Sequence, residues 1–107
     1  MKFYRNLYVS ESLQKKKEKI IKKLQMGKLQ RNLQLITLAV NPSNHLEIYS
    51  SMLLLQPLFP KKNIFIVGIV KDYGEALEFV EDLTQKVYNE TGRIDIRSYI
   101  LEKEQDG

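Results

Sequence analysis

The sequence predicts a single α+β domain, and three patterns in it support that class. Residues 11–26 and 74–91 carry apolar side chains at helical spacing, which predicts two amphipathic helices. Four other segments are rich in β-branched and aromatic residues or alternate between apolar and polar side chains, as strands do. These expected strands are residues 4–9, 33–40, 63–70 and 94–101. The elements follow the order β-α-β and then β-α-β, with an insertion between the second and third main strands. This order is typical of a ferredoxin-like βαββαβ sandwich, in which an antiparallel sheet has two helices on one face.

Capping residues mark the expected helix ends. Ser10 or Ser12 can cap the first helix, and Gly27 stands where a left-handed residue would end it. Asp72 and Glu75 have the spacing of a capping box at the start of the second helix.

The remaining segments are assigned by composition. His45–Tyr49 is either a further short strand or a continuation of the same ribbon, and Met52–Gln56 is a helical turn that Pro57 and Pro60 end. Residues 102–107 are expected to be a frayed, charged tail, so that the domain covers residues 1–101.

The strongest expected strand has no polar face. Ile64–Val70 consists of seven apolar or glycine residues, so both faces of this strand must be covered. The Met52–Phe59 segment or a second copy of the chain could provide the second cover. Because the segment holds more apolar surface than a short turn can bury, we expect a homodimer through this face. The residues expected to form that contact are Leu53, Leu54, Leu58 and Phe59.

Charge is divided unevenly along the chain. Residues 1–31 carry ten Lys and Arg against two Glu, a net charge of +8, whereas residues 32–107 carry seven against eleven acidic residues, a net charge of −4. The basic stretch 12–31 could therefore contact a polyanion or an acidic partner. The candidate contact residues are Lys15, Lys16, Lys19, Lys22 and Lys23.

Four interpretations of the basic stretch remain open. The favoured one is internal compensation, because two helices on one sheet face would place these lysines beside the acidic second helix. Nucleic acid would be bound through nonspecific, salt-dependent phosphate contacts. An acidic protein partner is a third possibility. A membrane is disfavoured, because the stretch lacks Trp and Phe anchors.

A second candidate site lies on the last expected strand. Asp95, Arg97 and Tyr99 share one face of it, and Tyr73 would lie near the end of the neighbouring strand. A carboxylate, a guanidinium and two phenols around one cleft could bind a polar ligand. Ion pairing across an edge strand, without a ligand, is the favoured alternative.

The composition argues against an enzyme. There is no cysteine, His45 is the single histidine, and no glycine-rich phosphate loop or activated nucleophile is recognisable. We therefore expect no catalytic residue, no metal and no cofactor. Residues 1–10 hold no apolar run of signal-peptide length, and the longest apolar stretches are too short to span a bilayer, so the expected location is the cytoplasm.

Three strings carry a resemblance to known proteins. They are LYVSESL at residues 7–13, LLQP at residues 54–57 and VGIVKDYGEAL at residues 67–77. The chain resembles, over most of its length, a small family of uncharacterised bacterial proteins, and that resemblance implies no activity, site or substrate. The expected fold is also similar to ACT and PII-like regulatory modules. The sequence thus predicts a non-enzymatic regulatory or protein-interaction module, with a small-ligand sensor or a nonspecific nucleic-acid binder as alternatives.

Overall fold

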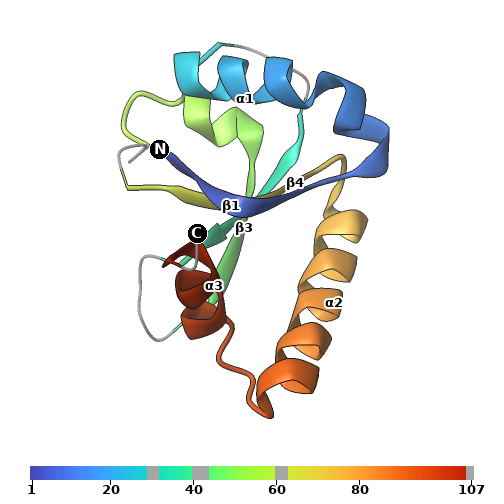
Figure 1. Cartoon of the computed structure of the whole chain (residues 1–107). Helices are drawn as coiled ribbons and strands as arrows, with labels where there is room; N and C mark the ends of the chain where they lie inside the picture. The colour runs from blue at the N-terminus through green and yellow to red at the C-terminus, as the bar shows by residue number, and fades with distance from the viewer. Residues whose placement is uncertain (29–31, 40–43, 60–62, 106–107) are drawn as a thin grey trace.

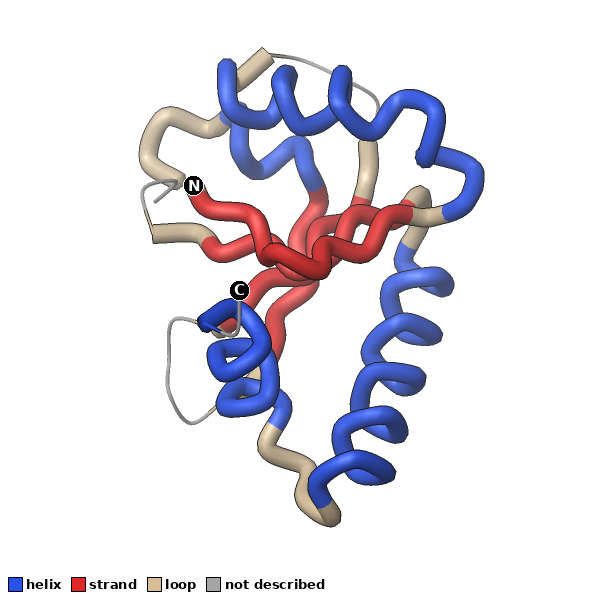
Figure 2. The backbone as a smooth tube through the Cα atoms, viewed as in Figure 1, coloured by secondary structure: helices blue, strands red, loops and turns tan. Residues whose placement is uncertain are grey.

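A four-stranded sheet lies between two layers of helices in the computed structural model of the chain (Figures 1 and 2). The structure describes residues 1–28, 32–39, 44–59 and 63–105. The expected strand end at Val40, the proline stop at Pro60, the last residues of the basic stretch (29–31) and the end of the tail (106–107) lie outside these ranges. The elements in chain order are β1 (Lys2–Val9), the 3₁₀ helix η1 (Glu11–Lys16), α1 (Lys17–Met26), β2 (Gln34–Leu38), β3 (Leu46–Ser50), the 3₁₀ helix η2 (Ser51–Leu55), β4 (Phe65–Val70), α2 (Tyr73–Thr91) and α3 (Ile96–Gln105).

The sheet is mixed, with the strand order β1-β4-β2-β3. β4 pairs with β1 in parallel and with β2 in antiparallel orientation, in a register that places Ile69 opposite Leu35. β2 and β3 form an antiparallel pair, which confirms a strand in the inserted segment.

The α+β class is confirmed, but the ferredoxin-like arrangement is wrong. A ferredoxin-like sheet is antiparallel and has its helices on one face, whereas here β1 and β4 are parallel. α1 packs on one face of the sheet, and α2 and α3 pack on the other. The expected strand 94–101 is also wrong, because most of that segment is the helix α3.

Residues 96–101 form a helix because of a local cap and a buried helical stripe. The Asp95 carboxylate accepts hydrogen bonds from the Ser98 amide (3.1 Å) and the Ser98 hydroxyl (2.8 Å), the pattern of an N-cap. Ile96, Tyr99 and Ile100, at positions i, i+3 and i+4, are all buried.

The helix continues into the expected tail. Residues 102–105 belong to α3, and the Glu104 carboxylate accepts a hydrogen bond from the Arg5 amide (2.7 Å) and lies 3.5 Å from the Lys2 ammonium. These contacts tie the end of α3 to β1.

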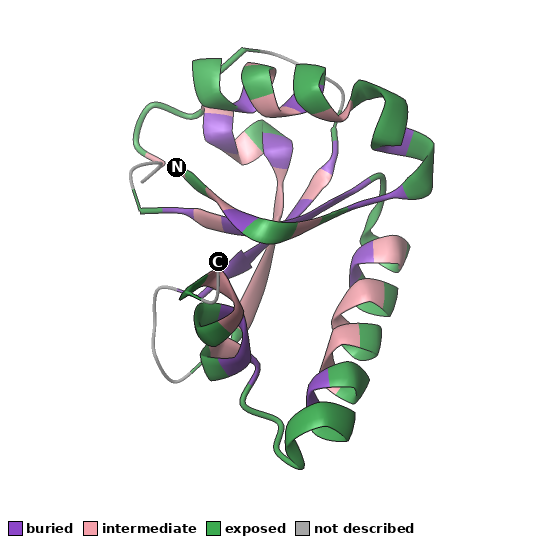
Figure 3. Cartoon of the chain, viewed as in Figure 1, coloured by how far each residue is buried: buried purple, intermediate pink, exposed green. Residues whose placement is uncertain are grey.

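Both faces of β4 are buried, as the apolar run predicts (Figure 3). Ile66 and Ile69 belong to a core shared with η1, α1 and η2. Val67 and Val70 belong to two adjoining clusters shared with α2 and α3. The chain thus covers both sheet faces with its own helices.

The residues expected at a dimer contact lie in different environments. Leu54 is buried in the core under α1, and Leu53 and Phe59 are half-buried. Phe59 packs edge-on against Tyr49, with the ring centroids 5.4 Å apart. Leu58 alone of the four is exposed, at 96%. Self-association stays a prediction, but it is not needed to cover the sheet.

The expected caps are mostly confirmed. Gly27 ends α1 with φ 65°, in the left-handed region. Half of the expected capping box is present: the Asp72 carboxylate accepts a hydrogen bond from the Glu75 amide at 2.9 Å, whereas the Glu75 carboxylate accepts from the Lys71 amide at 3.4 Å. Ser10 precedes η1 without a capping hydrogen bond from its side chain, and its hydroxyl instead donates to the Glu75 carboxylate at 2.5 Å.

Replacing the cap of α3 tests the corrected assignment. Asp95→Ala should measurably lower the free energy of unfolding, because two hydrogen bonds to the first turn are lost. Asp95→Asn should keep most of the stability, since asparagine is an equally good N-cap. Chemical denaturation followed by circular dichroism measures both, and equal stability of Asp95→Ala and the unchanged protein would contradict a capped helix here.

Candidate functional site

The first candidate site is a stripe of lysines on the outer side of η1 and α1. Leu13, Ile20 and Leu24 turn inward and are buried in the core under α1. The lysines follow the complementary i, i+3, i+4 spacing on the outward side. We call this surface the basic face; its members are Lys15, Lys16, Lys19, Lys22 and Lys23.

The basic face is not neutralised by neighbouring residues. Among the described residues, none of the five lysine ammonium groups forms an ion pair or a hydrogen bond. Four of them are exposed, and Lys23 is half-buried. Between residues 12 and 28 the sequence has seven lysines and a single acidic residue, Glu18.

The interpretation that the acidic second helix compensates these lysines is wrong. α2 carries Glu75, Glu78, Glu81, Asp82 and Glu90, but it packs on the opposite face of the sheet from α1 (Figure 1). The physical reason is that β4 needs cover on both faces, and the chain meets this need with α1 on one face and α2 on the other. The lysines therefore face outward, with the sheet between them and α2.

The residues expected to form a ligand cleft on the last strand are held by structural contacts. The Arg97 guanidinium donates to the Ala39 carbonyl at 2.6 Å, beyond the end of β2. The Arg97 amide donates to His45 Nδ1 at 3.4 Å. This imidazole nitrogen also lies 3.9 Å from the Asp95 carboxylate. Hydrogen bonds from the Ser98 amide and hydroxyl lower the pKa of Asp95. These groups join α3 to the β2–β3 end of the sheet.

Tyr73 lies far from that group. It is the first residue of α2 and is 57% exposed, whereas Asp95 follows the other end of the helix. The 19 residues of α2 span about 28 Å. The structure therefore does not bring Tyr73 together with Asp95 and Arg97.

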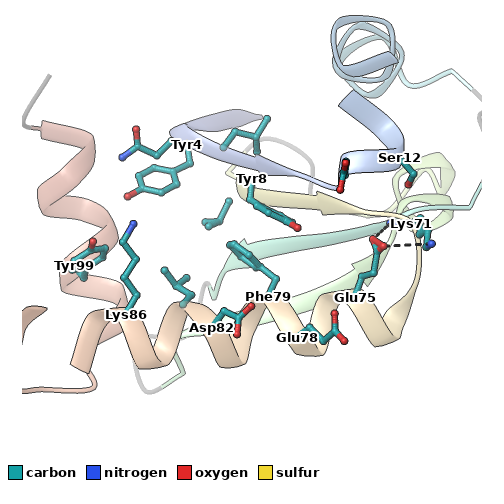
Figure 4. A pocket seen from close by; sticks show the side chains of 15 residues that line it. Tyr4, Tyr8, Ser12, Lys71, Glu75, Glu78, Phe79, Asp82, Lys86 and Tyr99 are labelled. Carbon is teal, nitrogen blue, oxygen red and sulfur yellow. Dashed lines mark hydrogen bonds and ion pairs between the residues drawn. The ribbon is translucent and has the colours of Figure 1, made fainter. Parts of the chain in front are cut away.

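Tyr99, the fourth member of the expected cleft, lines a groove that was not among the predicted sites (Figure 4). The groove lies between β1, α2 and α3 on the sheet face opposite α1, and its volume is about 840 Å³. Its rings are Tyr4 and Tyr8 from β1, Phe79 from α2 and Tyr99 from α3.

A bulge in β1 contributes to the groove. The β1–β4 register changes from Phe3 opposite Ile66 to Tyr8 opposite Gly68, so four β1 residues lie opposite Val67 alone. This segment, residues 4–7, supplies Tyr4 and Leu7 to the groove wall.

The two tyrosines at the α3 end of the groove are neutral hydrogen-bonding groups. The Tyr99 hydroxyl donates to the Glu90 carboxylate at 3.0 Å, and burial together with this carboxylate raises the pKa of Tyr99 to about 12. Burial also raises the pKa of Tyr4.

One signal for the groove was present in the sequence. The alternation of β1 puts Tyr4, Asn6 and Tyr8 on one side of the strand, and all three line the groove. The expected strand at 94–101 concealed this signal, because the segment beside β1 is the helix α3.

Among the described residues, no three His, Asp or Glu side chains come close enough together to hold a metal ion. None of the described helices combines the length and apolarity needed to cross a membrane. No protein-family model, curated protein or solved structure matches the chain. The resemblance to uncharacterised bacterial proteins therefore stays a prediction.

Removing the Tyr99 hydroxyl should change the stability at alkaline pH. The folded protein holds this proton to a pH of about 12, and an unfolded tyrosine to about 10. The stabilisation that the protonated Tyr99 hydroxyl contributes to the folded state is therefore fully present below a pH of about 10, and it is lost as the pH rises from about 10 to about 12. Tyr99→Phe should be about 1 kcal/mol less stable at neutral pH, because the hydrogen bond to Glu90 is lost.

Urea unfolding at several pH values checks this expectation. The free energy of unfolding should fall less steeply for Tyr99→Phe than for the unchanged protein across that alkaline range. Tyr73→Phe is the matched control, since the Tyr73 hydroxyl has no hydrogen bond within the described part of the chain. Parallel curves for Tyr99→Phe and the unchanged protein would contradict the assignment.

Proposed function

We propose that this protein is a non-catalytic binding module that contacts the phosphate backbone of duplex nucleic acid through its basic face. The single observation that carries this proposal is the position of α1 and α2 on opposite faces of the sheet. It leaves five lysines directed outward with no acidic partner among the described residues. Lysine clusters of this kind bind polyanions by neutralising phosphates and releasing counterions.

The chemistry of the surface favours nucleic acid over an acidic protein. Protein interfaces are centred on large apolar or aromatic anchors surrounded by polar residues. On η1 and α1 the one exposed large hydrophobic residue is Met26. Phosphate contacts need no apolar centre, so the surface suits a phosphate backbone better.

The same surface favours a duplex over a single strand. Proteins that bind single strands stack bases on aromatic side chains, and the sequence has no aromatic residue between Tyr8 and Tyr49. The stretch from Lys15 to Lys23 spans about 12 Å at helical rise. That length of duplex carries about seven phosphate charges, of which the lysines can reach three or four.

The affinity for duplex DNA or RNA should fall steeply with salt. With three or four phosphates neutralised, the logarithm of the binding constant should fall with the logarithm of salt concentration with a slope of about −3 to −4. Fluorescence anisotropy with a labelled duplex, titrated at four salt concentrations, measures the slope. Two unrelated duplex sequences should give the same slope and affinity.

Single substitutions locate the contact. Lys19→Gln and Lys22→Gln should each weaken binding and reduce the magnitude of the slope by about 1. Lys86→Gln makes the same charge change on α2, on the other sheet face, and should leave the slope unchanged. An equal effect of all three variants, or no binding at about 50 mM salt, would refute the proposal. Binding to polyglutamate without binding to a duplex would assign the face to an acidic protein instead.

A further inference from the structure

The groove between β1, α2 and α3 has the size of a small-molecule site. Its volume is about 840 Å³, and small-molecule pockets typically measure about 300–1,000 Å³. Leu7, Val67 and Leu83 supply apolar surface to it. It lies on the sheet face opposite α1 and is thus separate from the lysines of the basic face.

Aromatic rings dominate the middle of the groove. Tyr8 from β1 and Phe79 from α2 stack with their centroids 4.6 Å apart and their planes 18° from parallel (Figure 4). The approach of Phe79 depends on Gly68, since a Cβ at that position would lie 3.3 Å from the Phe79 ring. Exposed ring faces attract organic cations through the ring quadrupole.

The charges around the rings are mostly negative and mostly unpaired. Glu11, Glu78 and Asp82 line the groove, and none of the three carboxylates forms an ion pair or a hydrogen bond with a described residue. Glu75 also lines it, but its carboxylate accepts from the Ser10 hydroxyl and lies 3.6 Å from the Lys71 ammonium. That pairing neutralises Lys71, the one lysine that lines the groove near Glu75.

The unpaired charges therefore favour a cation near the stacked rings. Lys86, the remaining lysine of the groove, stands at the end marked by Tyr4 and Tyr99 (Figure 4). It would repel a cation there, so the favourable position is over Tyr8 and Phe79, between the carboxylates.

The spacing of the carboxylates suits an extended organic cation better than a metal ion. Glu78 and Asp82 are one helical turn apart on α2, a rise of about 6 Å. Among the described residues no three such groups converge on one point. Separate ammonium groups joined by methylene chains match both the spaced carboxylates and the apolar surface between them.

We propose that this groove binds a linear aliphatic polyamine. Glu78 and Asp82 receive charge-assisted hydrogen bonds from two of its ammonium groups, and Glu11 approaches from η1. The methylene chain lies against the rings of Tyr8 and Phe79. This site is independent of the basic face and of nucleic-acid binding.

Calorimetric titration of the full chain with spermidine tests the site at about 0.15 M ionic strength. Glu78→Gln and Asp82→Asn should each raise the dissociation constant about tenfold, the effect of losing one charged hydrogen bond. Tyr8→Leu keeps the apolar contact but removes the ring face, and this variant should raise the dissociation constant about threefold. Circular dichroism confirms that each variant is folded, which is expected because Glu78 and Asp82 are exposed.

Glu81→Gln is the matched control. It removes the same charge from α2, but Glu81 does not line the groove, so the dissociation constant should stay within about twofold. The proposal is overturned if spermidine releases no binding heat at millimolar concentration. It is also overturned if Glu81→Gln weakens binding as much as Glu78→Gln, since that shows diffuse attraction to an acidic surface. Equal binding of a neutral diol of the same length, or binding of a basic peptide but not of spermidine, refutes it as well.

Discussion

The rest of the structure depends on the burial of β4 on both of its faces. Ile66 and Ile69 point to one side and Val67 and Val70 to the other, and each is at most 1% exposed. At about 25 cal/mol per Å² of apolar surface, leaving either face in water would cost several kcal/mol, a large part of the stability of a small domain. A chain with this strand at the centre of its sheet must supply two covers. It does so with η1, α1 and η2 on one face and α2 and α3 on the other.

Dividing the helices between the faces also divides the charge. The lysine-rich helix and the glutamate-rich helix would neutralise each other if they lay side by side on one face. Here the whole sheet lies between them, and exposed charges farther apart than the Debye length of about 8 Å at physiological salt are largely screened from each other. Each helix therefore presents its own charge to solvent. This separation connects the hydrophobic requirement of β4 to two surfaces of opposite charge.

The groove arises where the cover of the second face is incomplete. α2 and α3 both pack on that face, and the wall opposite α2 is a strand whose pairing with β4 is interrupted. The bulge of residues 4–7 supplies side chains to the gap, and Gly68 leaves room for Phe79 to lie close to the sheet and to stack on Tyr8. The Ser10 hydroxyl and the Glu75 carboxylate join the end of β1 to the start of α2. The groove is thus a consequence of how two layers meet.

The sequence by itself determined the local features of this protein. The helical segments near 11–26 and 74–91, the left-handed Gly27 and the two buried faces of β4 follow from capping chemistry and hydrophobic periodicity, which are properties of short windows. They do not show that the first segment divides into a 3₁₀ helix, residues 11–16, and an α-helix, residues 17–26. Residues 94–101 show where a prediction from a short window is wrong. Ile96 and Ile100 share a face in a helix and also in a strand, because a separation of four residues fits both periods. Only the tertiary structure decided between them, placed α1 and α2 on opposite faces and formed the groove, because these outcomes depend on which distant surfaces can be buried together.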